Sequence, residues 1–224
     1  MTEQETLNEL QTMGTAQNRK VYARHGVGGE MFGVSYANLN KLKKRIKADH
    51  PLALQLWESG NHDARVLACM VADPEQCGAD LLERWVADLD NYVLCDAFSQ
   101  LAAASPQGWE KAQEWMPSRE EWRGRAGWTV AAILSGKDPS LDDDQLLSLV
   151  KTAEKEIHQR PNRTRDAMLN AVIAIGLRSE EGEAAALQAA RSIGKVDVDH
   201  GQTSCKTPDI REYIARAKKR RPKR

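Results

Sequence analysis

The sequence predicts an all-α protein built from a succession of short, paired helices. Apolar residues recur at spacings of three and four along almost all of the 224 residues, as they do on one face of a helix. Alternating apolar and polar runs, which are typical of strands, are nearly absent. Segments rich in glycine, proline, serine and asparagine interrupt the helical pattern at close intervals. We therefore expect helices of ordinary length, joined in pairs by tight turns.

Glycine and proline divide the first half of the chain. Residues 26–34 are rich in glycine and lack helical periodicity, so they separate the second helix from the third. Ser59-Gly60-Asn61 and Asp73-Pro74 combine a helix breaker with a capping residue. The helices expected here are, in order, Glu3–Met13, Asn18–Arg24, Tyr36–Lys47, Pro51–Glu58, His62–Ala72, Ala79–Leu89 and Tyr92–Ala104.

The second half is divided by Ser105-Pro106, Pro117-Ser118, residues 136–140 and Arg160-Pro161-Asn162. Asp142, Asp143 and Asp144 precede a further helix, where carboxylates favour the positive end of the helix dipole. The helix from residue 163 to 176 is apolar around much of its circumference, so we expect it to lie between two neighbours. The helices expected here are Trp109–Met116, Glu121–Leu134, Asp143–Gln159, Arg163–Gly176, Glu181–Ile193 and Ile210–Lys219.

Helix pairs recurring at intervals of roughly 35 to 40 residues resemble a HEAT-like repeat stack. We therefore expect a curved solenoid of HEAT-like helix pairs over residues 1–195. Residues 196–208 lack helical periodicity, and a basic tail follows. We expect residues 196–224 to form an extension that packs on the last repeat or trails from it.

The composition favours a cytoplasmic protein. No apolar run approaches the roughly 18 residues that a membrane helix requires, and the acidic amino terminus lacks the features of a secretory signal. The four cysteines, Cys69, Cys77, Cys95 and Cys205, form no CxxC pair, and we expect buried, reduced thiols. His200 and Cys205 are only two possible metal ligands, so we expect no metal and no cofactor.

Positive charge is concentrated in two segments, although Lys and Arg balance Asp and Glu at 32 each. This distribution favours DNA as a partner, while the alternative is that the charges merely solvate helix faces. The glycine-rich residues 26–34 lack the GxxxxGK[ST] order of a phosphate loop, so nucleotide binding is not favoured. The basic residues are Arg19, Lys20, Arg24, Lys41, Lys43, Lys44, Arg45 and Lys47 in the first segment, and Arg211, Arg216, Lys218, Lys219, Arg220, Arg221, Lys223 and Arg224 in the second.

Several segments together resemble the bacterial DNA alkylation repair (AlkD-like) family of HEAT-like repeat DNA glycosylases. The resemblance covers nearly the whole chain. It is carried by Phe32-Gly33-Val34, Trp57-Glu58 and Arg65 within residues 25–74, by LDNYVLCDAF at 89–98, and by EEWRGRAGWTVAAIL at 120–134. It implies a basic concave face that holds duplex DNA. It also implies excision of cationic alkylpurines, such as 7-methylguanine and 3-methyladenine, without base flipping.

The resemblance also implies where the chemistry lies. In the family, two tryptophans and an aspartate surround the deoxyribose of the lesion, and the carboxylate stabilises the sugar cation. The aspartate matches Asp96. Tyr92 stands in place of the first tryptophan, one turn earlier on the same helix face. Asn170 stands in place of the second tryptophan. The alternatives are that Asp96 caps or pairs with a neighbour, and that Tyr92 is a core aromatic.

Further candidates for DNA contact are basic residues, which grip phosphate, and one more tryptophan. We expect one arginine of each neighbouring pair to face away from the DNA, and Trp128 has a core position as its alternative. Three functions remain open: alkylpurine excision by a monomer with no obligate protein partner, non-catalytic binding of damaged or branched DNA, and a protein-binding scaffold. These further candidates are Lys43, Lys44, Arg123, Arg125, Arg163, Arg165 and Trp128.

Overall fold

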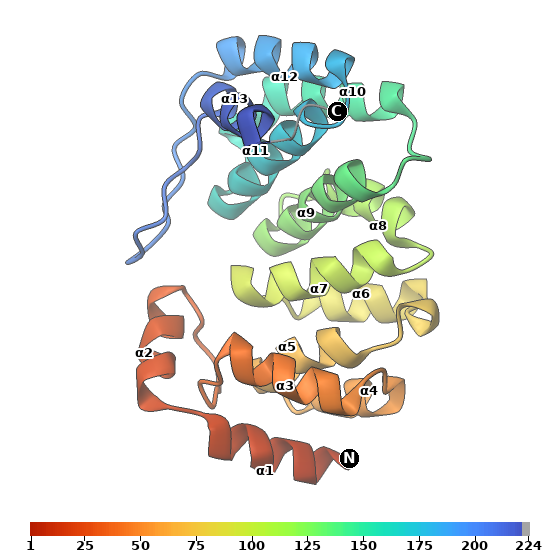
Figure 1. The fold of residues 1–224 in the computed structure, drawn as a ribbon, viewed down its shortest axis with the longest axis vertical. Helices are drawn as coiled ribbons and strands as arrows, with labels where there is room; N and C mark the ends of the chain where they lie inside the picture. Colours follow the sequence, from red (N-terminus) through yellow and green to blue (C-terminus); the bar gives the residue numbers. More distant parts are fainter. Residues whose placement is uncertain (221–224) are drawn as a thin grey trace. The chain divides into compact units, whose positions relative to one another are not determined.

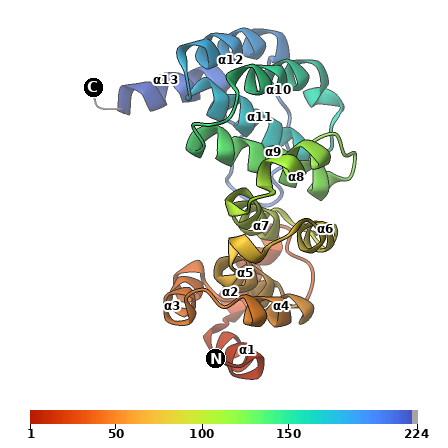
Figure 2. The same ribbon diagram turned by 90° about the vertical axis from the view of Figure 1, so that its right-hand side faces the viewer.

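The computed structural model describes residues 1–220, and it is all-helical over that range. The expectation of an all-α protein is confirmed (Figures 1 and 2). No helix in the described part of the chain is long and apolar enough to cross a membrane. The basic residues Arg221, Lys223 and Arg224 lie outside the described residues.

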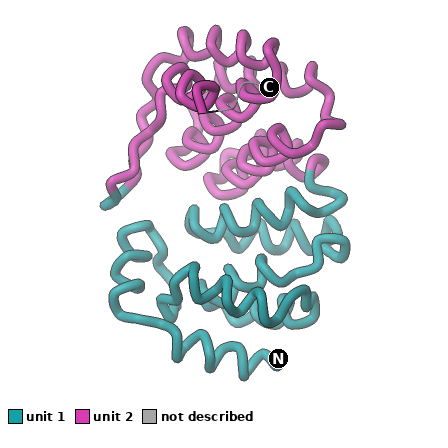
Figure 3. The backbone as a smooth tube through the Cα atoms, in the orientation of Figure 1, with its two compact units in different colours: residues 1–108, 201–203 teal, residues 109–200, 204–224 magenta. Residues whose placement is uncertain are grey.

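The chain divides into two compact units, which Figure 3 shows in different colours. Unit 1 comprises residues 1–108 and 201–203, and unit 2 comprises residues 109–200 and 204–224. The sequence suggested a different boundary, between a repeat domain of residues 1–195 and an extension of residues 196–224. That boundary stays a prediction.

Unit 1 contains seven α-helices and one 3-10 helix within its described residues, and polar side chains cap the start of most of the helices. Thr2, Ser35, Asn61 and Asn91 each accept a hydrogen bond from a backbone N–H in the first turn that follows, where no partner exists within the helix. The elements are α1 (Glu3–Met13), α2 (Ala16–Arg24), α3 (Tyr36–Ile46), α4 (His50–Glu58), α5 (His62–Val71), η1 (Pro74–Gln76), α6 (Ala79–Ala87) and α7 (Tyr92–Ala104).

Helix α5 is the central helix of unit 1, and it contacts α3, α4 and α7. Its side chains are almost all buried. Trp57 of α4 and Trp85 of α6 stack with their ring centroids 4.1 Å apart. The Trp57 indole N–H donates to the Asp88 carboxylate at 2.8 Å, so the ring is buried without an unsatisfied donor. Helices α3 and α7 both pack on α5.

Unit 2 is organised around α11, which contacts α9, α10, α12 and α13. The expectation that this apolar helix lies between neighbours is confirmed. Ile210 and Ile214 of α13 belong to the same buried cluster as the residues of α11, so the described part of the carboxyl-terminal segment packs on unit 2. The elements are α8 (Gly108–Trp115), α9 (Glu121–Lys137), α10 (Asp143–Glu156), η2 (Ile157–Gln159), α11 (Asn162–Gly176), α12 (Glu180–Ile193) and α13 (Ile210–Arg220).

Helix α9 extends to Lys137, although Gly136 suggested an end at Leu134. The C-cap residue Asp138, directly before Pro139, has an extended backbone with φ −99° and ψ 106°. The residue before a proline is sterically excluded from the helical region, so the proline sets this boundary. The same effect operates at Arg160, before Pro161, where the last turn of the α10 segment tightens into η2.

Candidate functional site

A tight turn at residues 32–34 sets the start of α3. The buried Asp63 carboxylate accepts hydrogen bonds from the backbone N–H groups of Phe32, Gly33 and Val34 at 2.7, 2.9 and 2.8 Å. Gly33 has φ +80°, a conformation that only glycine adopts readily. The Tyr22 hydroxyl donates to the Val34 carbonyl at 2.6 Å. Burial, together with the nearby Asp63, raises the pKa of Tyr22 to about 12. The turn is therefore held from α2 and from α5.

Helix α3 has one apolar face and one polar face. Leu39 and Leu42 are buried, and α3 packs on α5. The exposed side of the helix carries four positive charges, and the C-cap residue Lys47 adds a fifth at its end. The exposed polar and aromatic residues of α3 are Tyr36, Asn40, Lys41, Lys43, Lys44 and Arg45.

Helix α7 carries the two residues that the family resemblance singled out. Tyr92 and Asp96 are both partly buried, and their spacing of one turn places them on one helix face. The Tyr92 hydroxyl is hydrogen-bonded to Nδ1 of His25, and the two ring centroids are 5.8 Å apart. Tyr92 is thus attached to the end of α2, and the sequence gave no indication of this contact.

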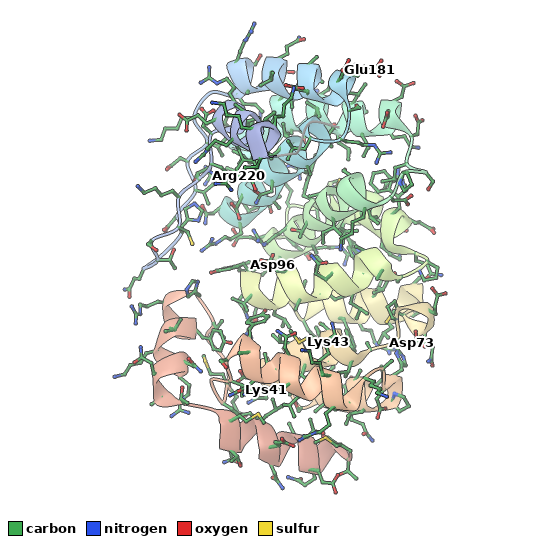
Figure 4. All side chains as sticks on the ribbon, in the orientation of Figure 1. Lys41, Lys43, Asp73, Asp96, Glu181 and Arg220 are labelled. Atoms are coloured by element: carbon green, nitrogen blue, oxygen red, sulfur yellow. The ribbon has the colours of Figure 1, made fainter. Side chains whose placement is uncertain are left out.

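A pocket of about 600 Å³ lies between α3 and α7, and α5 contributes to its wall. Asp96 and Lys43, which are far apart in the sequence, both line it, and Figure 4 labels the two residues. We call it the Asp96 pocket. Its lining residues are Tyr36, Lys43, Cys69, Met70, Ala72, Pro74, Asp96, Ala97, Gln100, Leu101 and Ala104.

The groups around the Asp96 pocket differ in charge. Burial raises the pKa of the Tyr36 hydroxyl well above its usual range, and Tyr22 and Asp96 add to this effect. The phenol therefore stays protonated and uncharged near neutral pH. Burial also raises the pKa of the Cys69 thiol, so Cys69 is not a thiolate nucleophile. Lys43 is exposed and contributes a positive charge to the lining of the same pocket.

A second hollow of about 430 Å³ shares Lys43 with the Asp96 pocket. Lys44 and Lys47 line it together with Asn40 of α3. Lys43, Lys44 and Lys47 therefore line an accessible surface next to the Asp96 pocket. Lysine side chains in such a position can contact phosphate groups of a polyanion.

The remaining candidates lie in unit 2, and two of them are part of its packing. Arg125 is 5% exposed, and its guanidinium donates to Asp166 at 2.9 Å and to the Arg163 carbonyl at 3.1 Å. Trp128 is 1% exposed, and its indole N–H donates to the Met116 carbonyl at 3.3 Å. Trp128 thus lies in the core, which was the alternative to DNA contact. Arg125 joins α9 to α11.

The other candidates in unit 2 are more accessible. Arg123, Arg163 and Arg165 are partly buried, and Asn170 of α11 is exposed. The backbone N–H of Arg163 donates to the Glu121 carboxylate at 2.7 Å. DNA contact by these residues stays a prediction. Within residues 1–220, His, Cys, Asp and Glu side chains form no group of three that could hold a metal ion.

Of the cysteines, Cys69, Cys77 and Cys95 are buried as expected, while Cys205 is exposed. The expectation of burial is wrong for Cys205, which lies in the non-helical segment before α13. Sequence reasoning missed Tyr36, Gln100 and His25. Tyr36 could have been found, because it stands seven residues before Lys43 in a predicted helix and therefore on the same face.

Residues 4–219 match the family of DNA alkylation repair enzymes, and the chain belongs to this family. One solved structure is similar to this chain over 98% of its length. It represents a new family of proteins related to the HEAT-like repeat DNA glycosylases with affinity for branched DNA structures. The TM-score is 0.90, the sequences are 26% identical, and 95% of the other chain is covered. The expected HEAT-like repeat fold is therefore confirmed.

Two proteins of Listeria are similar in sequence over nearly their whole length. A protein of Listeria innocua is 28% identical over 223 residues, and a protein of Listeria monocytogenes is 27% identical over 223 residues. Each match covers 95% of this chain and 95% of the relative.

Proposed function

We propose that this chain is a DNA-repair protein that binds duplex DNA with the α3 and α7 face of unit 1. The observation that carries the proposal is the Asp96 pocket, whose lining includes the partly buried Asp96 and the exposed Lys43. Lys43 also lines the neighbouring hollow, together with Lys44 and Lys47. The lysines would contact phosphates, and this contact fixes the position of DNA without reading its sequence. Membership of the DNA alkylation repair family supports this assignment.

The first candidate activity is excision of cationic alkylpurines such as 7-methylguanine and 3-methyladenine. The N-glycosidic bond breaks, its electron pair leaves with the base, and the base departs uncharged. Positive charge then develops on the deoxyribose, where the Asp96 carboxylate would stabilise it. Water adds to the sugar carbon and loses a proton. The partial burial of Asp96 favours this role, because an ionised group acts more strongly where water is partly excluded.

The second candidate is binding of damaged or branched DNA without excision. Two observations favour it. Asn170 is exposed where the family resemblance implies a tryptophan, and the Tyr92 hydroxyl is engaged by His25. In addition, the similar solved structure is described as belonging to proteins with affinity for branched DNA.

Base release from methylated DNA separates the two candidates. The wild-type protein is incubated with methylated genomic DNA, and released 7-methylguanine and 3-methyladenine are quantified by mass spectrometry. If Asp96 acts in excision, Asp96→Asn reduces release by about 100-fold to 1,000-fold, because one preorganised electrostatic contact is lost. Affinity for DNA stays equal or rises slightly, since a carboxylate repels phosphates.

Asp80→Asn is the matched control, because Asp80 is exposed on α6 and does not line the Asp96 pocket. Its release should equal that of the wild type. Binding without release by the wild type would exclude the first candidate and leave the second. Absence of binding to duplex and branched DNA alike would contradict both. The monomeric state and the cytoplasmic location stay predictions.

A further inference from the structure

Tyr36 is an unusual residue because part of its large aromatic side chain is exposed, although its hydroxyl is buried enough to raise the pKa. Its exposed fraction is 41%. Among the described residues, the other large hydrophobic side chains exposed to this degree are Met1 and Tyr213. Exposure of such a ring costs the apolar contacts that burial would provide. Tyr36 lines a pocket that also contains a charged residue of each sign, so its ring is accessible to whatever binds there.

The backbone beneath Tyr36 is firmly held. Tyr36 is the first residue of α3, directly after the N-cap Ser35 and the turn at residues 32–34. The turn is fixed by three hydrogen bonds to Asp63, which is fully buried. The backbone that carries the ring is therefore fixed before binding, and little backbone conformational entropy is lost when a ligand packs against the ring.

The chemistry around the ring suits a nucleotide. Lys43 lies two turns further along the same face of α3, and both residues line the Asp96 pocket. An aromatic ring beside a lysine is the combination that holds unpaired nucleotides, since the base stacks on the ring and the cation contacts the phosphate. Because the Tyr36 hydroxyl stays protonated, it adds no negative charge that would repel the phosphate.

We propose that the Tyr36 ring is a stacking platform for an unpaired DNA base, with Lys43 contacting an adjacent phosphate. This inference rests on the proposed DNA-binding function of the α3 and α7 face, and it names the substrate class of that site: DNA with at least one base outside the helical stack. A fully paired duplex would use the lysines but not the ring.

The test compares two labelled duplexes that differ only by one unpaired nucleotide. Affinities of the wild type, Tyr36→Ala, Tyr36→Phe and the control Tyr213→Ala are measured by fluorescence anisotropy at several salt concentrations. Tyr36→Ala should weaken binding to the bulged duplex by about 5-fold to 150-fold, the range that loss of one aromatic stacking contact produces. Its affinity for the paired duplex and its salt dependence should not change. Tyr36→Phe and Tyr213→Ala should behave as the wild type.

Two results would overturn the inference. If Tyr36→Ala weakens binding to both duplexes equally, Tyr36 contacts the DNA backbone and not an unpaired base. If Tyr36→Ala binds the bulged duplex as tightly as the wild type does, Tyr36 has no role in binding. In both cases the proposed DNA binding would stand. If the wild type binds neither duplex, the proposed function fails and this inference fails with it. Thermal melting verifies the fold of Tyr36→Ala, and Tyr36→Trp, which keeps an aromatic ring, should retain the preference for the bulged duplex.

Discussion

At the scale of single residues, Asp63 and Asp96 have the same side chain in two different environments. Asp63 is completely buried and accepts three backbone hydrogen bonds, so its role is to hold the turn before α3. Asp96 is partly buried and lines a pocket next to Lys43. Both lie in helices, and the family resemblance identified Asp96. Asp63 was missed because its partners are backbone groups some 30 residues earlier.

We expect Asp63→Asn to lower the free energy of unfolding by about 3 kcal/mol, because hydrogen bonds to a charged acceptor are lost and an amide N–H group faces backbone N–H groups. Urea denaturation, followed by circular dichroism, measures the change. Asp80→Asn is the control, since its carboxylate is exposed on α6. A loss of less than about 0.5 kcal/mol for Asp63→Asn, the range of ordinary surface substitutions, would show that the turn does not depend on the carboxylate.

The sequence pattern did not distinguish the two roles considered for Arg125 and for Trp128. Arg125 forms a buried ion pair with Asp166, and Trp128 packs in the core of unit 2. An arginine in a helix of small apolar residues has the same sequence pattern whether it contacts phosphate or a buried carboxylate. The partner decides the role, and the partner lies 41 residues away along the chain.

At the scale of elements, α3 is the helix that relates the fold to the proposed function. Its apolar face packs on α5, its polar face carries Lys43 and Lys44, and the C-cap residue Lys47 follows them. The amphipathic pattern and the basic cluster were both visible in the sequence. Helix ends were less predictable where two breakers compete, as in α9, where Pro139 and not Gly136 sets the boundary.

Charge reversal on α3, by Lys43→Glu combined with Lys44→Glu, should weaken binding to intact and alkylated DNA alike. The slope of log affinity against log salt is negative, and each lost phosphate contact makes it less steep by about 0.9, so we expect its magnitude to decrease by about 2 for the pair. A salt titration by fluorescence anisotropy measures the slope. Lys151→Glu with Lys155→Glu, on exposed positions of α10, is the matched control and should leave the slope unchanged. Equal slopes for the two double variants would show that Lys43 and Lys44 of α3 do not contact DNA.

At the scale of the whole molecule, periodicity and breakers were enough to predict an all-helical chain, and the family resemblance supplied the HEAT-like repeat. The division into units at residue 108 was not predicted, because it depends on contacts between helices and not on a change in composition. The Asp96 pocket was predicted only in part. Its carboxylate came from the resemblance, whereas Tyr36, Cys69 and Gln100 required the packing of α3, α5 and α7.

The location of bound DNA on the chain can be measured by photocrosslinking. A benzophenone amino acid replaces Gln100, which lines the Asp96 pocket, or Gln55, which is exposed on α4 and does not line it. Each variant is irradiated with labelled DNA, and the covalent complex is quantified on a denaturing gel. We expect strong crosslinking from position 100, reduced by high salt, and only background from position 55. Crosslinking from position 55 that equals or exceeds that from position 100 would contradict DNA binding at the α3 and α7 face.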